Sequence, residues 1–215
     1  MCFSAGASFG ASALLFGTGI ATVKKSEAAR YLVFASAPFL FSMQQFSEGM
    51  LWLSFQDPAL LAWHKPSIYT YSVFSQAVWP LWAPLSLWLI EPEPVRKKRL
   101  YYFLWIGIVL AAYMIFCLIA YGVTATVEAH HIRYQLHFPN MNVRRVLYFL
   151  ATIPPFFLSS RSGMKVFGIT LGLSLVLSAI FFRYYLISVW CFFAAIVSVL
   201  VLWIILKNRE GPDPQ

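Results

Sequence analysis

Long apolar runs, each closed by a charge or a proline, are the feature that most constrains the fold of this chain. A transmembrane helix needs about 20 consecutive apolar residues, and runs of roughly this length recur along the whole sequence. Of the 215 residues, 60% are hydrophobic and only 11% are charged, which leaves too little polar surface for a water-soluble domain. We therefore predict an integral membrane protein.

The apolar runs predict an all-α, seven-transmembrane-helix bundle. The expected spans cover residues 5–22, 31–55, 67–90, 100–122, 146–160, 166–182 and 186–206. The fifth is short and contains Pro154 and Pro155, so we expect it to begin within the preceding loop or to be kinked. One transmembrane domain over residues 1–207 and a disordered cytoplasmic tail over residues 208–215 complete the expected organisation.

The basic residues sort unevenly between the two sides of these spans. Of the 16 Lys and Arg residues, the majority on one side consists of Lys24, Lys25, Arg30, Arg96, Lys97, Lys98, Arg99, Arg161, Lys165, Lys207 and Arg209. The positive-inside rule then predicts an N-terminus outside the cell and a cytoplasmic C-terminus. Basic loops beside anionic headgroups account for the net charge of +8, so we expect no nucleic-acid partner.

This topology gathers the reactive side chains in the outer half of the bundle. Glu48 is the one carboxylate well inside a span, roughly 10 Å below the outer boundary at ~1.5 Å per residue, and such a group is a candidate functional residue. Gln44 and Gln45 share its helix face, and Gln76 of the next span reaches a similar depth. We expect a polar pocket here that binds a cofactor; the alternative is a neutral Glu48 in a network that only fixes helix packing.

Thiols and imidazoles converge on the same region. Cys2 begins the first span from the outside, Cys191 lies at about the depth of Glu48, and His130 and His131 stand in the loop between the fourth and fifth spans. That loop partly alternates apolar and polar residues, which predicts a small strand-like segment folded over the outer mouth. Adjacent residues of a strand point to opposite faces, so we expect only one of the two histidines to face the bundle.

Such a set of donors is typical of a transition-metal site. Thiolate and imidazole ligands favour copper or zinc over magnesium or calcium, and we favour copper at an oxidising outer face. A disulfide between Cys2 and Cys191 is the competing interpretation, because an oxidising exterior can join two thiols. A haem held by Cys or His is also compatible with the sequence.

Five segments carry a resemblance to a known family. They are MCFSAGASF at the N-terminus, QQFSEGMLW, WPLWAP, the pair His130 and His131, and VWCFFAA. Together they resemble a family of uncharacterised bacterial multi-pass membrane proteins, domain of unknown function 6629. The resemblance implies a bacterial origin and an inner-membrane location, and it places Cys2, Glu48 and Cys191 inside matching segments. It implies no activity.

Two further classes of function stay open. Seven helices with an outer N-terminus also resemble the ceramidase-like membrane hydrolases, in which a zinc-bound water attacks a lipid amide or ester. The last span here lacks their His-x-x-x-His pair. Prolines such as Pro80, Pro84 and Pro154 are compatible with the broken helices of a transporter, although the sequence contains no visible internal repeat.

The favoured interpretation is a copper site near the periplasmic face that serves electron transfer or metal handling. Cys2 and Cys191 supply sulfur, His130 or His131 supplies nitrogen, and Glu48 is a ligand or an anchor for one. The expected partners are the lipid bilayer, the metal ion and a periplasmic metal or redox partner. Whether the chain is an enzyme is left open by the sequence.

Overall fold

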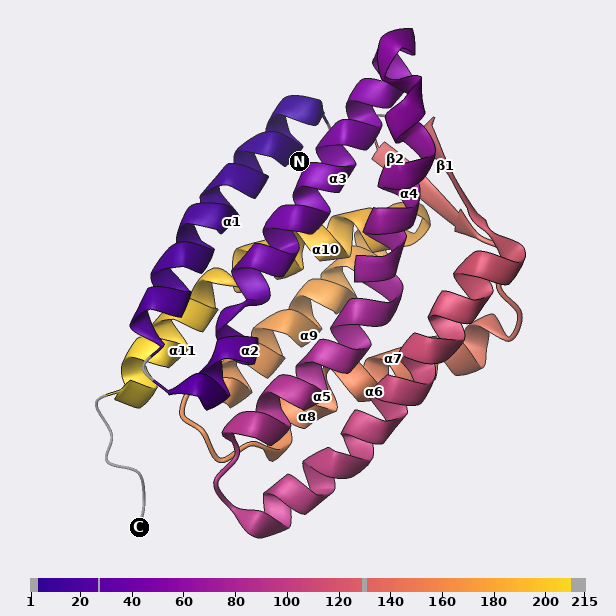
Figure 1. Cartoon of the computed structure of the whole chain (residues 1–215). Helices are drawn as coiled ribbons and strands as arrows, with labels where there is room; N and C mark the ends of the chain where they lie inside the picture. The colour runs from indigo at the N-terminus through magenta and orange to yellow at the C-terminus, as the bar shows by residue number, and fades with distance from the viewer. Residues whose placement is uncertain (1–3, 27, 129–130, 210–215) are drawn as a thin grey trace.

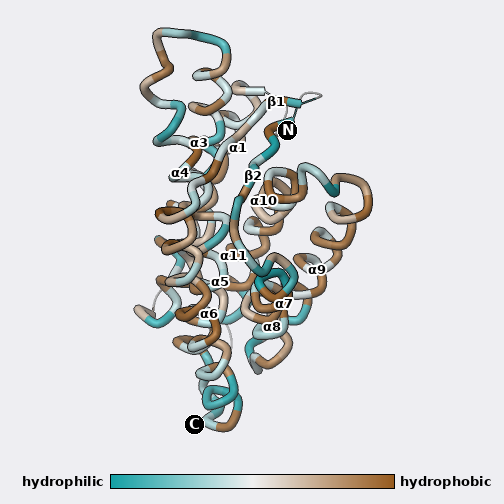
Figure 2. The backbone as a smooth tube through the Cα atoms, turned by 90° about the vertical axis from the view of Figure 1, so that its right-hand side faces the viewer, coloured by the Kyte–Doolittle hydropathy of each residue, from teal (hydrophilic) through white to brown (hydrophobic). Residues whose placement is uncertain are grey.

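The computed structural model describes residues 4–26, 28–128 and 131–209. The described chain is mostly helical, and its helices form two layers (Figures 1 and 2). One layer contains α1 (Ala5–Lys25), α3 (Ala37–Gln56), α4 (His64–Val73), α5 (Trp79–Ile90) and α6 (Pro94–Tyr121). The other contains α7 (Met141–Thr152), α8 (Pro154–Leu158), α9 (Met164–Phe181) and α10 (Leu186–Val197). The last helix, α11 (Val199–Arg209), packs against α1.

Short segments join the long helices. A 3-10 turn (Ala29–Tyr31) leads into the one-turn helix α2 (Leu32–Ala35). Further 3-10 turns precede α4 (Pro58–Trp63) and α10 (Arg183–Tyr185), and a π-helical turn (Phe74–Val78) links α4 to α5. The chain is therefore helical without interruption from Pro58 to Ile90.

Five helical stretches of the described residues are long and apolar enough to cross a membrane, which is consistent with the predicted membrane protein. They are Ala5–Lys25, Pro58–Ile90, Pro94–Tyr121, Met164–Phe181 and Arg183–Asn208. The expected spans 31–55 and 146–160 are not among them. The first corresponds to α3, which carries Gln44, Gln45 and Glu48, and the second is divided between α7 and α8.

The fifth expected span begins early and is broken, as its prolines predict. Helix α7 starts at Met141 instead of residue 146 and ends at Thr152. Ile153 then leaves the regular helical conformation, with φ of −110° and ψ of −55°, before α8 begins at Pro154. The break follows from the proline ring, which removes a backbone donor and disfavours a helical residue before it.

At the other end of the chain, α11 continues through Arg209, so Asn208 belongs to the last helix rather than to the expected tail. Its side-chain amide donates to the carbonyl oxygen of Ser162 at 3.1 Å, which holds the end of α11 beside the turn before α9. Residues 210–215 of the expected tail lie outside the described part of the chain.

The predicted strand-like segment is an antiparallel hairpin, and it lies at the end of the molecule where α1 begins (Figure 1). Its strands are β1 (Val123–Glu128) and β2 (His131–Leu136). Ile132 and Tyr134 alternate with more exposed residues and are buried. The Tyr134 ring stacks on Tyr71 of α4 with 4.5 Å between centroids, so the hairpin is fixed to the helical bundle.

Small residues let α1 and α3 pack closely. Ser12 Oγ donates to the carbonyl oxygen of Ser42 at 2.9 Å, and Ser42 Oγ donates to the carbonyl oxygen of Ser12 at 2.8 Å. A Cβ at Gly49 would stand 2.8 Å from the Phe9 ring, so that position has no room for a side chain. Small residues and hydroxyl hydrogen bonds of this kind are typical of helix pairs in membranes.

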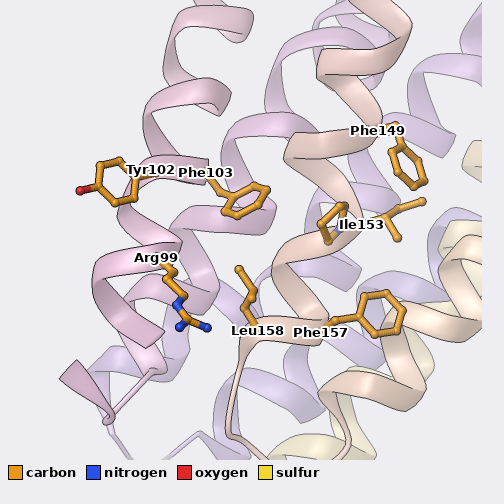
Figure 3. Close-up of a pocket in the computed structure, with 8 residues that line it drawn as sticks. Arg99, Tyr102, Phe103, Phe149, Ile153, Phe157 and Leu158 are labelled. Carbon is orange, nitrogen blue, oxygen red and sulfur yellow. The ribbon is translucent and has the colours of Figure 1, made fainter. Parts of the chain in front are cut away.

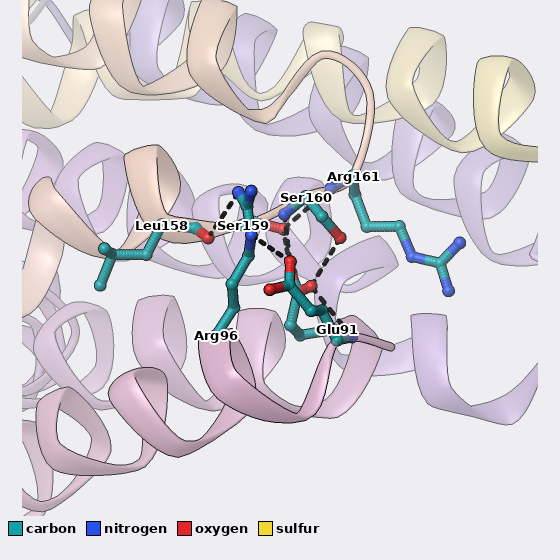
Figure 4. A network of polar contacts seen from close by, with 7 residues as sticks. Glu91, Arg96, Leu158, Ser159, Ser160 and Arg161 are labelled. Atoms are coloured by element: carbon teal, nitrogen blue, oxygen red, sulfur yellow. Dashed lines mark hydrogen bonds and ion pairs between the residues drawn. The ribbon is translucent and has the colours of Figure 1, made fainter. Parts of the chain in front are cut away.

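A buried carboxylate joins the two layers (Figure 4), at the end of α5 that lies away from the hairpin (Figure 1). Glu91 follows α5 and is only 2% exposed. It accepts hydrogen bonds from Ser159 Oγ at 2.9 Å, from the Ser160 backbone N–H at 2.8 Å and from Ser160 Oγ at 2.5 Å. Arg161 Nε donates to the Ile90 carbonyl oxygen at 2.9 Å, so the end of α5 and the turn between α8 and α9 hold each other.

Helices α5 and α6 approach each other closely at Gly107. A Cβ there would stand 2.3 Å from the Pro80 carbonyl oxygen. We predict that Gly107→Ala lowers the free energy of unfolding by about 1–3 kcal/mol, because a backbone oxygen cannot move aside as a flexible side chain can. Thermal unfolding in detergent measures the change. Gly10→Ala in α1 is the matched control, since nothing lies within 4 Å of its Cβ position; equal melting temperatures for the two variants would contradict the prediction.

Candidate functional site

Glu48 of α3 is fully buried among polar side chains. Its Oε1 accepts a hydrogen bond of 2.6 Å from Ser188 Oγ of α10, 140 residues further along the chain. Neither residue has measurable exposure to solvent. A buried carboxylate is costly unless it is hydrogen-bonded, so this contact both stabilises Glu48 and joins the two layers.

The Cys191 thiol shares the same buried volume. Cys191 lies three residues after Ser188 on α10, is 4% exposed and is a free thiol. It contacts the side chains of Tyr71 and Gln44, and it is close enough to Glu48 for an electrostatic interaction. We call this cluster of Gln44, Glu48, Tyr71, Ser188 and Cys191 the Glu48 pocket.

The three predicted pocket glutamines are all buried, but they make different contacts. Gln44 Oε1 accepts a hydrogen bond of 2.8 Å from Trp79 Nε1, which holds the amide beside Cys191. Gln76 lies in the π-helical turn, where its Nε2 donates to Ser75 Oγ at 3.3 Å. Within the described part of the chain, neither end of the fully buried Gln45 amide has a hydrogen-bond partner.

A small cavity adjoins the Glu48 pocket. Its volume is about 40 Å³, and its lining includes Cys191, Trp79, Tyr148 and Trp190. A cavity of that size has room for a water molecule or a single ion. The thiol is therefore buried without being fully enclosed by protein atoms.

The remaining predicted ligands do not complete this pocket in the described structure. His131 stands at the start of β2, where its ring stacks on Tyr185 with 4.6 Å between centroids and meets the edge of Phe182 at 5.7 Å. Cys2 and His130 lie outside the described residues. The structure thus brings Glu48 and Cys191 together and places His131 against the turn before α10.

Within residues 4–26, 28–128 and 131–209, no three His, Cys, Asp or Glu side chains form a group that could hold a metal ion. A metal at the Glu48 pocket therefore needs further donors of these types from outside the described residues. Cys2 and His130 are the donors that the sequence analysis offers for this role.

Two members of the Glu48 pocket escaped the sequence analysis. Ser188 carries a readable signal, since it precedes Cys191 by three residues and must share its helix face. Tyr71 carries no such signal, because nothing local separates it from the other tyrosines of the chain. Glu91 was also missed, although a carboxylate between an apolar run and a proline marks the buried end of a helix.

We predict that Ser188→Ala lowers the free energy of unfolding by roughly 0.6–1.7 kcal/mol, because it removes a hydrogen bond between helices from the Glu48 carboxylate. Ser178→Ala is the matched control. Its hydroxyl is equally buried but donates only to the Ser174 carbonyl oxygen of its own helix, a bond that adds little to stability. Unfolding in detergent compares the two variants; a loss at Ser178 as large as that at Ser188 would refute the assignment.

Comparison with known proteins identifies one family. The sequence model of a family of unknown function, DUF6629, matches residues 1–214. This match confirms the family resemblance found in the sequence. No curated protein and no solved structure matches the chain.

Proposed function

We propose that this chain, which belongs to the DUF6629 family of unknown function, is a membrane protein that binds copper in the Glu48 pocket. One observation carries the proposal. A carboxylate from α3 and a thiol from α10, 0% and 4% exposed, share one buried volume next to a small cavity. Both groups are metal donors.

The donor chemistry favours a soft transition metal. A bound cation stabilises the thiolate form of Cys191, so binding releases the thiol proton and the site gains a sulfur ligand. Ser188 orients the Glu48 carboxylate by its hydrogen bond, as outer hydrogen-bond partners do in metal sites. Gln45, three residues before Glu48, is fully buried and its amide has no hydrogen-bond partner among the described residues; such a group marks a place for a bound water or ligand.

The proposed site is completed by Cys2 and His130, which lie outside the described residues, since His131 packs on Tyr185 and forms no metal-holding group with Glu48 and Cys191. Thiolate with imidazole suits copper, which exchanges one electron or is passed between carriers. We accordingly propose electron transfer or metal handling at the outer face, with a periplasmic metal or redox partner.

Elemental mass spectrometry of the protein purified in mild detergent tests the proposal. We expect close to one copper ion per chain after copper exposure, and loss of that copper in Cys191→Ser and Glu48→Gln. Copper uptake is expected to rise with pH, because the thiol and imidazole donors must lose protons before they bind.

Cys117→Ser is the matched control, because Cys117 is also a free buried thiol but lies in α6, away from the contacts of Cys191. It is expected to keep its copper. Copper retained by Cys191→Ser and Glu48→Gln, or absent from the wild-type protein, would reject the metal site and leave the Glu48 pocket as a structural contact.

We further propose seven passes across a bacterial inner membrane, with the N-terminus outside and the C-terminus in the cytoplasm. The support comes from the position of the segments that carry most of the Lys and Arg residues. The end of α1, the turn between α5 and α6, the turn between α8 and α9, and the end of α11 all lie at the lower end in Figure 1. Figure 2 shows hydrophobic colour along the helices and hydrophilic colour near the start of α6. The positive-inside rule assigns this end to the cytoplasm.

Labelling with a membrane-impermeant maleimide tests this orientation. Lys65 and Lys98 are both exposed and lie at opposite ends of the bundle. In a Cys2→Ser background, we predict that Lys65→Cys reacts in intact cells and that Lys98→Cys reacts only after the membrane is permeabilised. Cys117 and Cys191 are buried and give little background. The reverse pattern of labelling would invert the topology, and labelling of both positions in intact cells would refute it.

A further inference from the structure

An open groove runs along the outside of the bundle between α6 and the broken helix pair α7 and α8. Its volume is about 520 Å³, within the usual range of roughly 300–1,000 Å³ for a ligand site. Apolar side chains dominate its lining, among them Phe103, Phe149, Ile153, Phe157 and Leu158. In Figure 3, Phe103 and Leu158 point into the space between the helices.

The groove has a local cause in the sequence. Pro154 ends α7, and α8 continues for only five residues before the chain turns toward α9. A straight helix in place of α7 and α8 would pack its side chains against α6 along its whole length. The break leaves part of α6 without such a neighbour. The chain thus leaves an apolar surface uncovered at the point where it changes direction.

A single cationic side chain closes one end of the groove. Arg99 lines it, and in Figure 3 the guanidinium lies below Phe103. Arg99 is exposed, and no hydrogen bond or ion pair joins it to another described residue. Two neighbouring basic groups are already engaged, since Arg96 pairs with Glu93 and donates to the Leu158 carbonyl oxygen at 3.3 Å, and Lys97 lies over the Trp88 ring. Lys98 is exposed but does not line the groove.

We propose that this groove binds an anionic glycerophospholipid, with an acyl chain along Phe103 and Leu158 and the phosphate at Arg99. The charge pattern argues for this occupant: the apolar part of the groove faces the hydrocarbon, and its basic end lies at the start of α6 among basic residues that sit at headgroup level. A zwitterionic lipid carries the same phosphate together with an ammonium group, which repels the Arg99 guanidinium and weakens the pairing. The inference uses the proposed membrane orientation and is independent of copper binding.

Native mass spectrometry of the full-length protein, titrated with phosphatidylglycerol or with phosphatidylcholine of the same acyl chains, tests this site. We expect tighter binding of phosphatidylglycerol to the wild-type protein. Arg99→Gln is expected to weaken phosphatidylglycerol binding about fivefold, the contribution of one basic side chain at a membrane surface, and to weaken phosphatidylcholine binding less, because the ammonium of that lipid offsets its phosphate. Leu158→Trp fills the groove and is expected to abolish binding of both lipids.

Lys98→Gln is the matched control. It removes the same charge at the residue before Arg99, and the Lys98 side chain does not line the groove. It is expected to keep full phosphatidylglycerol binding. Equal losses in Lys98→Gln and Arg99→Gln would show diffuse surface charge in place of a site. Equal affinity of the wild-type protein for the two lipids, unchanged binding in Leu158→Trp, or a dimer that Leu158→Trp dissociates would also overturn the proposal.

Discussion

Polar groups that leave water inside this bundle must find partners within it, and the way in which they do so holds the two helical layers together. At the hairpin end, Ser188 of the second layer donates to the buried Glu48 carboxylate of the first. At the opposite end, the Glu91 carboxylate of the first layer accepts hydrogen bonds from Ser159 and Ser160 of the second. Two buried carboxylates therefore hydrogen-bond the layers to each other, one near each end, and apolar side chains pack the layers together over the region that separates them.

The sequence predicts the fold well where one physical signal dominates. Apolar runs of membrane length locate most of the helices, alternation locates the hairpin, and Pro154 locates the break between α7 and α8. The sequence does not predict which helices pack together, because a lipid-facing side and a protein-facing side of a membrane helix are equally apolar. The π-helical turn before α5 was also unforeseen, since nothing in Phe74–Val78 distinguishes it from an ordinary helix.

The candidate site divides in the same way. Glu48 and Cys191 could be predicted because carboxylates and thiols are rare in apolar spans. Their similar depth in the predicted membrane was therefore enough to suggest that they lie close together. Their hydrogen-bonding neighbours could not, because Tyr71 and Trp79 belong to residue types that also fill apolar cores, and only the packed structure separates these roles. Gln76 is buried as expected, but the contacts of its side chain could not be predicted, because a similar depth on a neighbouring helix does not fix the direction in which a side chain points. Its Nε2 donates to Ser75 Oγ.

The stack of Tyr134 on Tyr71 bears on how a solute could reach the Glu48 pocket. Tyr71 contacts the Cys191 thiol and stacks on Tyr134 of the hairpin, so it lies between the thiol and the hairpin end of the molecule. A small solute that followed this path to the thiol would pass between the two rings only when they separate. On such a path, the rate of entry would depend on the lifetime of an aromatic contact in the hairpin, whereas the affinity of the proposed metal site would depend on donors on the helices. A substitution in the hairpin could then change the rate of metal exchange without changing the affinity of the proposed site.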